Sequence, residues 1–394
     1  MYSMSFWERE SVFNGIDVFI AGSGIVGLCS AIAMKKIQPA ARIVVGDRGF
    51  LPYGASTRNA GFACFGSISE LLDDLSRESE NEVAKRVERR WKGLQKLRAL
   101  LGDEAIGFEN NGGYELFTSN DQLILDQCLE TLPRMNRMME EITGKKEIYS
   151  LQNENIGTFG FKQVKSLIAN SEEGQIHTGN MMVALMRKAT AEGVIILNGI
   201  EIESLEDHVN HTEIVCNNGL RIHAKKTLLA TNGFAKNLIP ELEVEPARAQ
   251  VLITSPIEKL SFKGIFHYDL GYYYFRNIGN RILFGGGRNM DFETEHTTTF
   301  GLTDIIQNRL DELLKTVIIP NTPYEVEMRW SGIMGMGGSK SPIIKKTGHN
   351  TYCAVRMGGM GIAIGALVGE ETARMMDDGR WTMDDGRWTI YDLP

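Results

Sequence analysis

The sequence lacks an apolar run long enough to cross a membrane, and it begins without a secretory leader. Its most apolar stretch, residues 357–369, is about a dozen residues long and rich in glycine, whereas a spanning helix needs roughly 20 apolar residues. The first ten residues contain no cationic segment followed by an apolar one, which is the pattern of a signal peptide. We therefore expect a cytoplasmic protein without a membrane span.

Cysteine is also scarce, and the cysteines show no pattern. An odd number of scattered thiols argues against a disulfide framework or a zinc site and favours reduced cysteines. The five are Cys29, Cys64, Cys128, Cys216 and Cys353. His208 and His211 have a spacing that a metal could use, but they lie in a predicted polar turn for which we identify no third ligand. We expect no metal.

Basic blocks are missing as well. The net charge is −8, and acidic residues outnumber basic ones by 50 to 42, so the chain is a poor candidate for binding nucleic acid or an anionic membrane surface. P-loop and nucleophile-elbow motifs are absent too. With 394 residues, 43% of them hydrophobic, the chain is long enough for two packed domains.

What the chain does contain is a glycine turn between an apolar strand and an apolar helix. Residues 17–34 read DVFIAGSGIVGLCSAIAM. Gly22 allows the turn, Gly24 lets the backbone approach a pyrophosphate, and Gly27 lets helix and strand pack closely. Asp47 ends a second apolar strand, twenty residues after Gly27, where a carboxylate can bind a ribose. This order predicts a dinucleotide site for NAD or for the adenosine half of FAD, against the alternative of a purely structural turn.

Apolar periodicity predicts the other elements. Helices are expected over 67–100, over 120–143, from about 176 to 193, and up to residue 375 near the C-terminus. Strands are expected at 114–118, 194–197, 212–216 and 220–223, and residues 246–325 are rich in strand patterns. At the end of the chain, residues 376–382 recur at once as 383–389, which we interpret as a tandem duplication without function.

Three further segments place glycine and small polar residues at predicted strand or helix ends. They read GASTRNAG at 54–61, ATNG at 230–233 and GGMG at 358–361. The last precedes an apolar helix, whose N-terminus would favour negative charge. Ordinary glycine loops are the structural alternative for each segment.

A run of tyrosines marks a predicted strand at 271–276. Because alternate side chains face opposite sides of a strand, Tyr272, Tyr274 and Arg276 share one face. Such a face suits a pocket for an amine or a carboxylate, although tyrosines in sheets also serve packing alone.

Together, these motifs resemble the FAD-dependent amine and amino-acid oxidoreductases of the D-amino-acid oxidase type, which include glycine oxidase, monomeric sarcosine oxidase and the γ-glutamylputrescine oxidoreductases. The likeness covers nearly the whole chain. The segments GASTRNAG, RILFGGG at 281–287 and WSG at 330–332 are most similar to the γ-glutamylputrescine branch.

The resemblance implies an α/β fold, with a Rossmann-like FAD-binding domain and an α+β substrate domain built on a mixed β-sheet. The FAD domain would be discontinuous, formed by residues 1–75, 165–245 and 326–394, and the substrate domain would take 76–164 and 246–325. The catalytic residues expected in this arrangement are Arg58, Tyr272, Tyr274 and Arg276. The residues expected to bind FAD are Gly22, Ser23, Gly24, Ile25, Val26, Gly27, Asp47, Arg48, Ser56, Thr57, Arg58, Asn59, Ala60, Gly61, Thr231, Asn232, Gly233, Gly332, Gly358, Gly359, Met360, Gly361 and Ile362.

The chain departs from its relatives at three positions. Glycine-oxidase-like members carry an arginine for the substrate carboxylate shortly after the Trp-x-Gly motif, where this chain has Met334, so that clamp is missing or comes from elsewhere, for example Arg276 or Arg329. Sarcosine-oxidase-like members attach the flavin through a cysteine near Gly332, so we expect non-covalent FAD. They also have a lysine that assists oxygen where Leu283 stands, so fast oxidase activity is not expected.

The resemblance predicts an oxidoreductase that removes hydride from a carbon next to the nitrogen of a small amine or amino acid. The electron acceptor would be O2 or another carrier. Two alternatives remain, a flavoprotein that binds FAD without catalysis as a binding or assembly subunit, and an NAD-linked dehydrogenase. The second leaves the late glycine segment unexplained.

Overall fold

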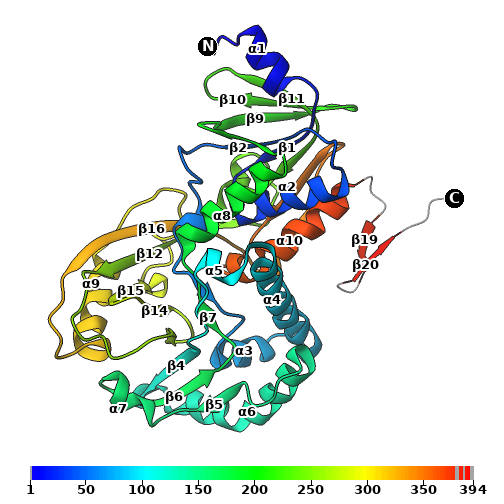
Figure 1. The fold of residues 1–394 in the computed structure, drawn as a ribbon. Helices are drawn as coiled ribbons and strands as arrows, with labels where there is room; N and C mark the ends of the chain where they lie inside the picture. Colours follow the sequence, from blue (N-terminus) through cyan, green and yellow to red (C-terminus); the bar gives the residue numbers. More distant parts are fainter. Residues whose placement is uncertain (1, 378–380, 385–386, 391–394) are drawn as a thin grey trace.

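The computed structural model describes residues 2–377, 381–384 and 387–390. Figure 1 shows two parts built around separate sheets, with the N-terminal segment at one end of the molecule. Helices α2, α8 and α10 lie against the first sheet, and α6, α7 and α9 border the second. The helices are α1 (Phe6–Glu8), α2 (Ile25–Ile37), α3 (Ile68–Leu75), α4 (Glu80–Leu101), α5 (Asp103–Ile106), α6 (Gln122–Thr143), α7 (Asn155–Phe159), α8 (Thr178–Ala191), α9 (Asp304–Leu313) and α10 (Gly361–Met376).

The first sheet has a parallel centre in the order β18-β11-β1-β2-β8. An antiparallel strand, β17, extends one edge, and β9 and β10 form a meander with β11. The strands are β1 (Ile16–Ala21), β2 (Ile43–Asp47), β8 (Ile195–Asn198), β9 (Ile202–Asp207), β10 (Thr212–Cys216), β11 (Arg221–Leu229), β17 (Ile343–Lys346) and β18 (Thr351–Val355).

Both faces of this sheet are covered, which explains the continuous apolar runs of its central strands. Val18 and Ile20 of β1 face the helical core formed by α2, α8 and α10, whereas Phe19 and Ala21 face the opposite core under the β9–β10 meander. Glycines bring the helices close together. A Cβ on Gly369 of α10 would lie 2.6 Å from the Cβ of Cys29 in α2.

The second sheet is mixed, with strand order β16-β12-β15-β14-β13-β4-β6-β5. Most neighbours are antiparallel, and β13 pairs with β4 in parallel. Its core contains stacked phenylalanines, such as Phe266 and Phe275, whose ring centroids lie 4.7 Å apart. The strands are β4 (Gly113–Thr118), β5 (Tyr149–Leu151), β6 (Val164–Asn170), β12 (Glu245–Thr254), β13 (Ile265–Tyr268), β14 (Tyr273–Ile278), β15 (Arg281–Gly286) and β16 (Val326–Met336).

The α/β fold with a Rossmann-like sheet and a mixed second sheet confirms the sequence prediction. One predicted helix, 67–100, is divided into α3 and α4 because Ser79 starts a new helix with a capping box, in which its backbone N–H donates to Glu82 Oε2 at 3.1 Å. Two short pairs complete the structure, β3 (Phe62–Ala63) with β7 (Gly174–Gln175) and β19 (Trp381–Asp384) with β20 (Arg387–Ile390). The duplicated heptapeptide lies partly outside the described residues.

The predicted domain boundaries remain a prediction, and strand pairing departs from them at two places. β6 and β16 were expected in the nucleotide-binding domain but pair within the second sheet. Helix α4 was expected in the substrate domain, yet its Leu94 and Leu97 belong to the core under the first sheet. Gly93 allows this contact, because a Cβ there would lie 2.2 Å from the carbonyl oxygen of Ala363 in α10.

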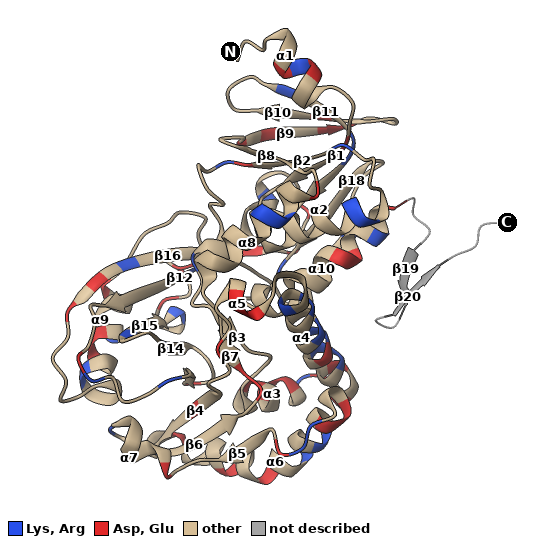
Figure 2. Cartoon of the chain, viewed as in Figure 1, with Lys and Arg blue, Asp and Glu red and all other residues tan. Residues whose placement is uncertain are grey.

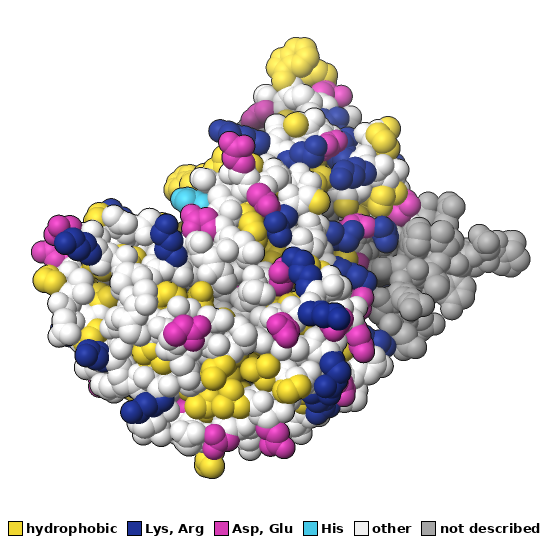
Figure 3. Space-filling model, turned by 60° about the horizontal axis from the view of Figure 1, so that its bottom comes forward, with side chains coloured by type: hydrophobic (Ala, Val, Ile, Leu, Met, Phe, Trp, Pro, Cys, Tyr) yellow, Lys and Arg dark blue, Asp and Glu magenta, His cyan; other side chains and the backbone are white. Residues whose placement is uncertain are grey.

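Acidic and basic side chains are interspersed on the surface. They alternate along α4 and α6 in Figure 2, and the face shown in Figure 3 carries both signs without a dominant one. Within the part of the chain that the structure describes, no helix combines the length and the apolar character that crossing a membrane requires.

Candidate active site

A cavity of about 620 Å³ lies where the carboxyl ends of β1, β2, β11 and β18 meet the second sheet. The glycine turn after β1 and the start of α10 form one side of it, and residues of β12, β13, β14 and β16 form the other. This is the place where open α/β sheets bind their ligands. Most of the residues predicted to bind a cofactor line it, namely Gly22, Gly24, Ile25, Val26, Asp47, Arg48, Ser56, Arg58, Asn59, Ala60, Gly61, Thr231, Asn232, Gly332, Gly358, Gly359, Met360, Gly361 and Ile362.

Four predicted cofactor residues do not line the cavity. Thr57 donates its hydroxyl to the carbonyl of Pro52, at 2.8 Å. Gly27 and Gly233 make close backbone contacts, since a Cβ at these positions would lie 1.9 Å from Gly22 O and 2.5 Å from Met334 O, respectively. Ser23 is fully buried. These four residues support the segments that form the cavity without lining it themselves.

The glycine turn leaves a cradle of backbone groups at the start of α2. Gly22 has a φ of 103°, and a Cβ on it would lie 2.8 Å from the carbonyl oxygen of Ala230. The N–H of Ile25, in the first turn of α2, has no helical partner and donates to Ser56 Oγ at 3.0 Å. The backbone here can approach a phosphate closely.

Asp47 is a buried carboxylate that organises the end of β2. Its Oδ2 accepts hydrogen bonds from the backbone and hydroxyl of Ser23, at 3.0 and 2.8 Å, and its Oδ1 accepts from Gly49 N at 3.0 Å. Nearby, the guanidinium of Arg48 stacks on Phe234 at 3.9 Å from the ring centroid. These contacts hold the glycine turn and the segment after β2 in place, and Asp47 still lines the cavity.

The late glycine segment turns sharply into α10. Gly358 and Gly359 have φ values of 57° and 80°, in the region that favours glycine. Asn232 also has a positive φ, 48°, and its side-chain oxygen accepts from the backbone N–H groups of Arg356 and Met357, at 3.1 and 3.2 Å. The two segments are thereby held together, with the N-terminus of α10 facing the cavity.

Arg58 lies in the cavity wall between two aromatic rings. Its guanidinium is 4.6 Å from the centroid of Tyr53 and 4.5 Å from that of Phe300, and it donates to the carbonyl of Ser331 at 2.9 Å. The indole N–H of Trp330 donates to the carbonyl of Arg58 at 3.0 Å. The GASTRNAG segment at 54–61 and the WSG segment at 330–332 therefore meet at the cavity.

The tyrosine side chains alternate between the two faces of the strand as predicted, but Arg276 does not line the cavity. Tyr272 and Tyr274 line it, whereas Tyr273 is buried in the opposite core. The Arg276 guanidinium is 5% exposed and donates to the carbonyls of Gly61 and Ile176, at 2.9 and 2.7 Å. These carbonyls occupy donors of the guanidinium that a substrate would need, and the catalytic role of Arg276 stays a prediction.

Arg329, the other arginine considered as a carboxylate clamp, is also occupied. Its Nη2 donates to both carboxylate oxygens of Asp311, at 2.8 and 2.9 Å, and its Nη1 donates to Gln307 Oε1. Arg288, at the end of the RILFGGG segment, instead lines the cavity. Its guanidinium lies 4.7 Å from the Phe292 ring and has no hydrogen bond or ion pair with another residue that the structure describes. Sequence reasoning missed Arg288, although three consecutive glycines before an arginine were a signal.

His267 is a second residue that the sequence did not single out. It lies on β13, lines the cavity, and its Nε2 is buried without a hydrogen-bond partner among the described residues. Burial lowers the pKa of this imidazole, which favours the neutral form. Glu173 lies 3.9 Å away, and burial raises the pKa of its carboxyl to about 8.

The fold and the cavity together define a dinucleotide-binding protein in which a second sheet closes over the cradle. The family model for FAD dependent oxidoreductases, named DAO, matches residues 17–375. The chain belongs to this family.

Solved structures share the fold at low sequence identity. An L-proline dehydrogenase from P. horikoshii superimposes with a TM-score of 0.73 at 16% identity, covering 93% of this chain and 95% of that one. A glycine oxidase from Geobacillus kaustophilus gives 0.72 at 17% identity, covering 92% and 94%. Among curated proteins, the bifunctional protein ThiO/ThiG of Synechocystis sp. is 24% identical over 240 residues, which are 60% of this chain. The chain matches about a third of that longer protein, 32% of its length.

The residues of the cavity fit the FAD that the family implies. Gly24, the glycine at which the backbone can approach a pyrophosphate, lines the cavity at the N-cap of α2. Thr231 Oγ1 is buried at the cavity without a hydrogen-bond partner among the described residues, so it is available to a ligand. The first turn of α10 offers a positive dipole end to a negatively charged ring.

Proposed function

We propose that this protein oxidises the C–N bond of a small amine or amino acid, with FAD held without a covalent link. The observation that carries the proposal is a single cavity that joins the glycine turn after β1 to a wall of phenols, the imidazole of His267 and the guanidinium of Arg288. Relatives with the same fold are named for the oxidation of glycine, L-proline and iminodiacetate.

Bound FAD would supply the oxidant, taking a hydride from the carbon next to the nitrogen, and hydrolysis of the imine product gives a carbonyl compound. The chain's own residues bind, orient and shield the substrate. Arg58 and the start of α10 would hold the cofactor ring and stabilise negative charge on it. Tyr272, Tyr274 and His267 would form the substrate wall.

Two side chains favour a substrate that enters with a neutral nitrogen. Burial raises the pKa of Tyr274 to about 12, so its hydroxyl stays protonated and can donate or accept a hydrogen bond. The neutral His267 can accept one at Nε2. Neither group is required to carry a charge during the reaction, and no protein base is needed if the amine is already deprotonated.

The proposal that FAD is bound non-covalently is based on the positions and reactivity of the cysteines. Gly332 lies near the position where a linking cysteine is expected, and a Cβ added to it would lie 3.2 Å from the Cβ of Arg58. Cys64 is a cavity residue, but burial raises its pKa far above the ordinary value, which makes it a weak nucleophile. Acid precipitation of the purified protein should therefore release all of the yellow colour into the supernatant.

An anaerobic screen tests the function. The yellow holoprotein is mixed with amines and amino acids, and the visible flavin band is followed, with dithionite as the reference reductant. Bleaching by compounds that carry a hydrogen on the carbon next to nitrogen supports the proposal. Bleaching by dithionite alone would favour the alternative of an FAD-binding protein without catalysis.

A further inference from the structure

Histidines and carboxylates gather on the outer face of the β9–β10–β11 meander, on the first sheet. Glu206 of β9 lies directly opposite Glu213 of β10, and His223 of β11 lies opposite Glu213 on its other side. Two carboxylates facing each other across an antiparallel pair repel. A cation bound beside the row Glu206–Glu213–His223 would therefore relieve the repulsion between the two carboxylates.

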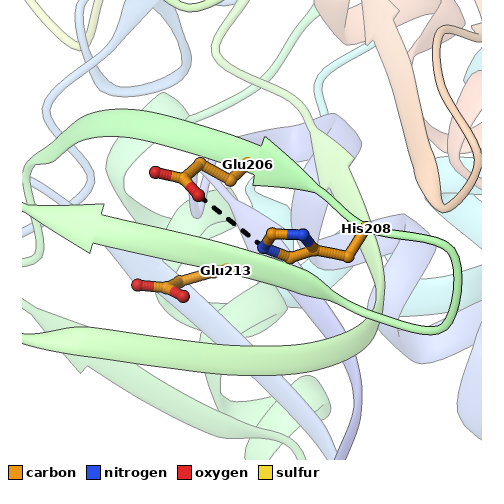
Figure 4. Close-up of side chains that lie close together, drawn as sticks. All are labelled: Glu206, His208 and Glu213. Carbon is orange, nitrogen blue, oxygen red and sulfur yellow. Dashed lines mark ion pairs between the residues drawn. The ribbon is translucent and has the colours of Figure 1, made fainter.

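The turn between β9 and β10 adds two more imidazoles. His208 Nε2 lies 3.7 Å from Glu206 Oε2, and Figure 4 shows the two side chains pointing toward each other with Glu213 beside them on the next strand. One ligand atom from each of these three residues lies within 4.8 Å of the others. The ring of His211 stacks on His208 at 4.7 Å and lies 5.5 Å from His223.

We propose that Glu206, His208 and Glu213 form a binding site for a divalent transition-metal ion of the zinc class. Imidazole nitrogen and carboxylate oxygen are ligands that zinc prefers, and tetrahedral coordination places ligand atoms about 3.3 Å apart. Small side-chain rotations reach that spacing, because the side chains of Glu206 and His208 are 58% and 45% exposed. His223 or water completes the ligand set.

Arg221 does not block this site. It pairs with Oε1 of Glu213, which leaves the second carboxylate oxygen to face a cation. No third ligand for His208 and His211 was identified from the sequence, although Glu206 and Glu213 each lie two residues from one of them. The pairing of β9 with β10 shows that the two carboxylates lie opposite each other. None of these side chains lines the flavin cavity. The ion would therefore link β9 to β10 across the turn at 208–211 and act on the stability of that hairpin.

Zinc titration of the metal-stripped holoprotein against a chromophoric zinc chelator tests the site. We expect one zinc per chain, with affinity falling at least tenfold in His208→Ala and in Glu213→Gln. The control is His296→Ala, which removes an equally exposed histidine from a pair with Glu245 at 3.0 Å and should leave zinc binding unchanged.

Zinc should also raise the unfolding midpoint of the parent protein and not that of His208→Ala, since a ligand stabilises the state that binds it. The flavin spectrum reports that each variant is folded. The proposal is overturned if the parent does not compete with the chelator, or if His208→Ala and Glu213→Gln bind zinc as the parent does.

Discussion

Arg288 is a cavity arginine whose guanidinium contacts the Phe292 ring and has no hydrogen bond or ion pair with another described residue. A substrate carboxylate in the cavity would give it one, with a charge-assisted hydrogen bond worth about 1.5–3 kcal/mol. Arg288→Ala should therefore lower kcat/KM for an amino acid roughly ten- to a hundredfold. The same variant should oxidise the corresponding amine without the carboxylate as the parent does. Equal losses for both substrates would show that Arg288 does not recognise the carboxylate.

Arg58 is expected to act on the cofactor rather than on the substrate. Its charge lies in the cavity wall between Tyr53 and Phe300, where it would stabilise the negative charge of a reduced flavin. Arg58→Ala should lower the flavin midpoint potential and slow anaerobic reduction, as measured by spectroelectrochemistry and stopped flow. The control is Arg134→Ala, which removes an exposed arginine paired with Glu80 on the surface. An unchanged potential in Arg58→Ala would make Arg58 a purely structural residue.

At the scale of elements, the contact between α2 and α10 depends on a missing side chain. A Cβ on Gly369 would lie 2.6 Å from Cys29 Cβ and 2.8 Å from Ser30 N, so the helices must separate to admit it. Gly369→Ala should destabilise the protein by about 1–3 kcal/mol, an overpacking cost, and lower its unfolding midpoint. Gly157→Ala on α7 meets nothing within 4 Å and should be neutral. Equal midpoints for both variants would contradict this account of the packing.

Glu173, in the segment that joins β6 to β7, is expected to make the stability of the protein depend on pH. Glu173 is buried and accepts hydrogen bonds from Phe65 N and Gly66 N, at 2.9 and 3.1 Å. Burial raises its pKa from 4.5 to about 8, so the folded protein binds more protons than the unfolded chain between these pH values. Stability should therefore fall as pH rises toward 8, by at most about 1.4 kcal/mol per pH unit.

Glu173→Gln removes this titration while keeping an acceptor oxygen. Between pH 6.5 and 8.5 its unfolding midpoint should fall less than that of the parent. Glu88→Gln, at an exposed pair with Lys92, should follow the parent. A Glu173→Gln midpoint that falls as steeply as the parent's would show that Glu173 does not titrate in this range.

At the scale of the whole molecule, the sequence was most informative where local chemistry fixes local structure. The glycine turn, Asp47 and the segments at 54–61, 230–233 and 358–361 could be singled out from the sequence because tight backbone geometry demands particular residues there, and residues of each line the cavity. The separation of Tyr273 from Tyr272 and Tyr274 followed from strand alternation alone.

The sequence could not predict contacts that depend on packing between distant segments. Arg276 was placed on the correct face of its strand, but its partners are carbonyls of residues 61 and 176, which only the tertiary fold brings together. His267 and Arg288 became candidates because they line the cavity without a hydrogen bond to another described residue, which depends on the tertiary fold. The pairing of β6 and β16 within the second sheet likewise depends on contacts between segments that are far apart in the sequence.

The central claim is that this cavity joins an FAD site to a substrate site for amine or amino-acid oxidation. An anaerobic titration of the holoprotein with product analysis tests it most directly. The account predicts that at least one amine or amino acid bleaches the flavin, with one carbonyl product formed per flavin reduced. A flavin that dithionite reduces, but that stays oxidised with every amine and amino acid tested, would contradict it.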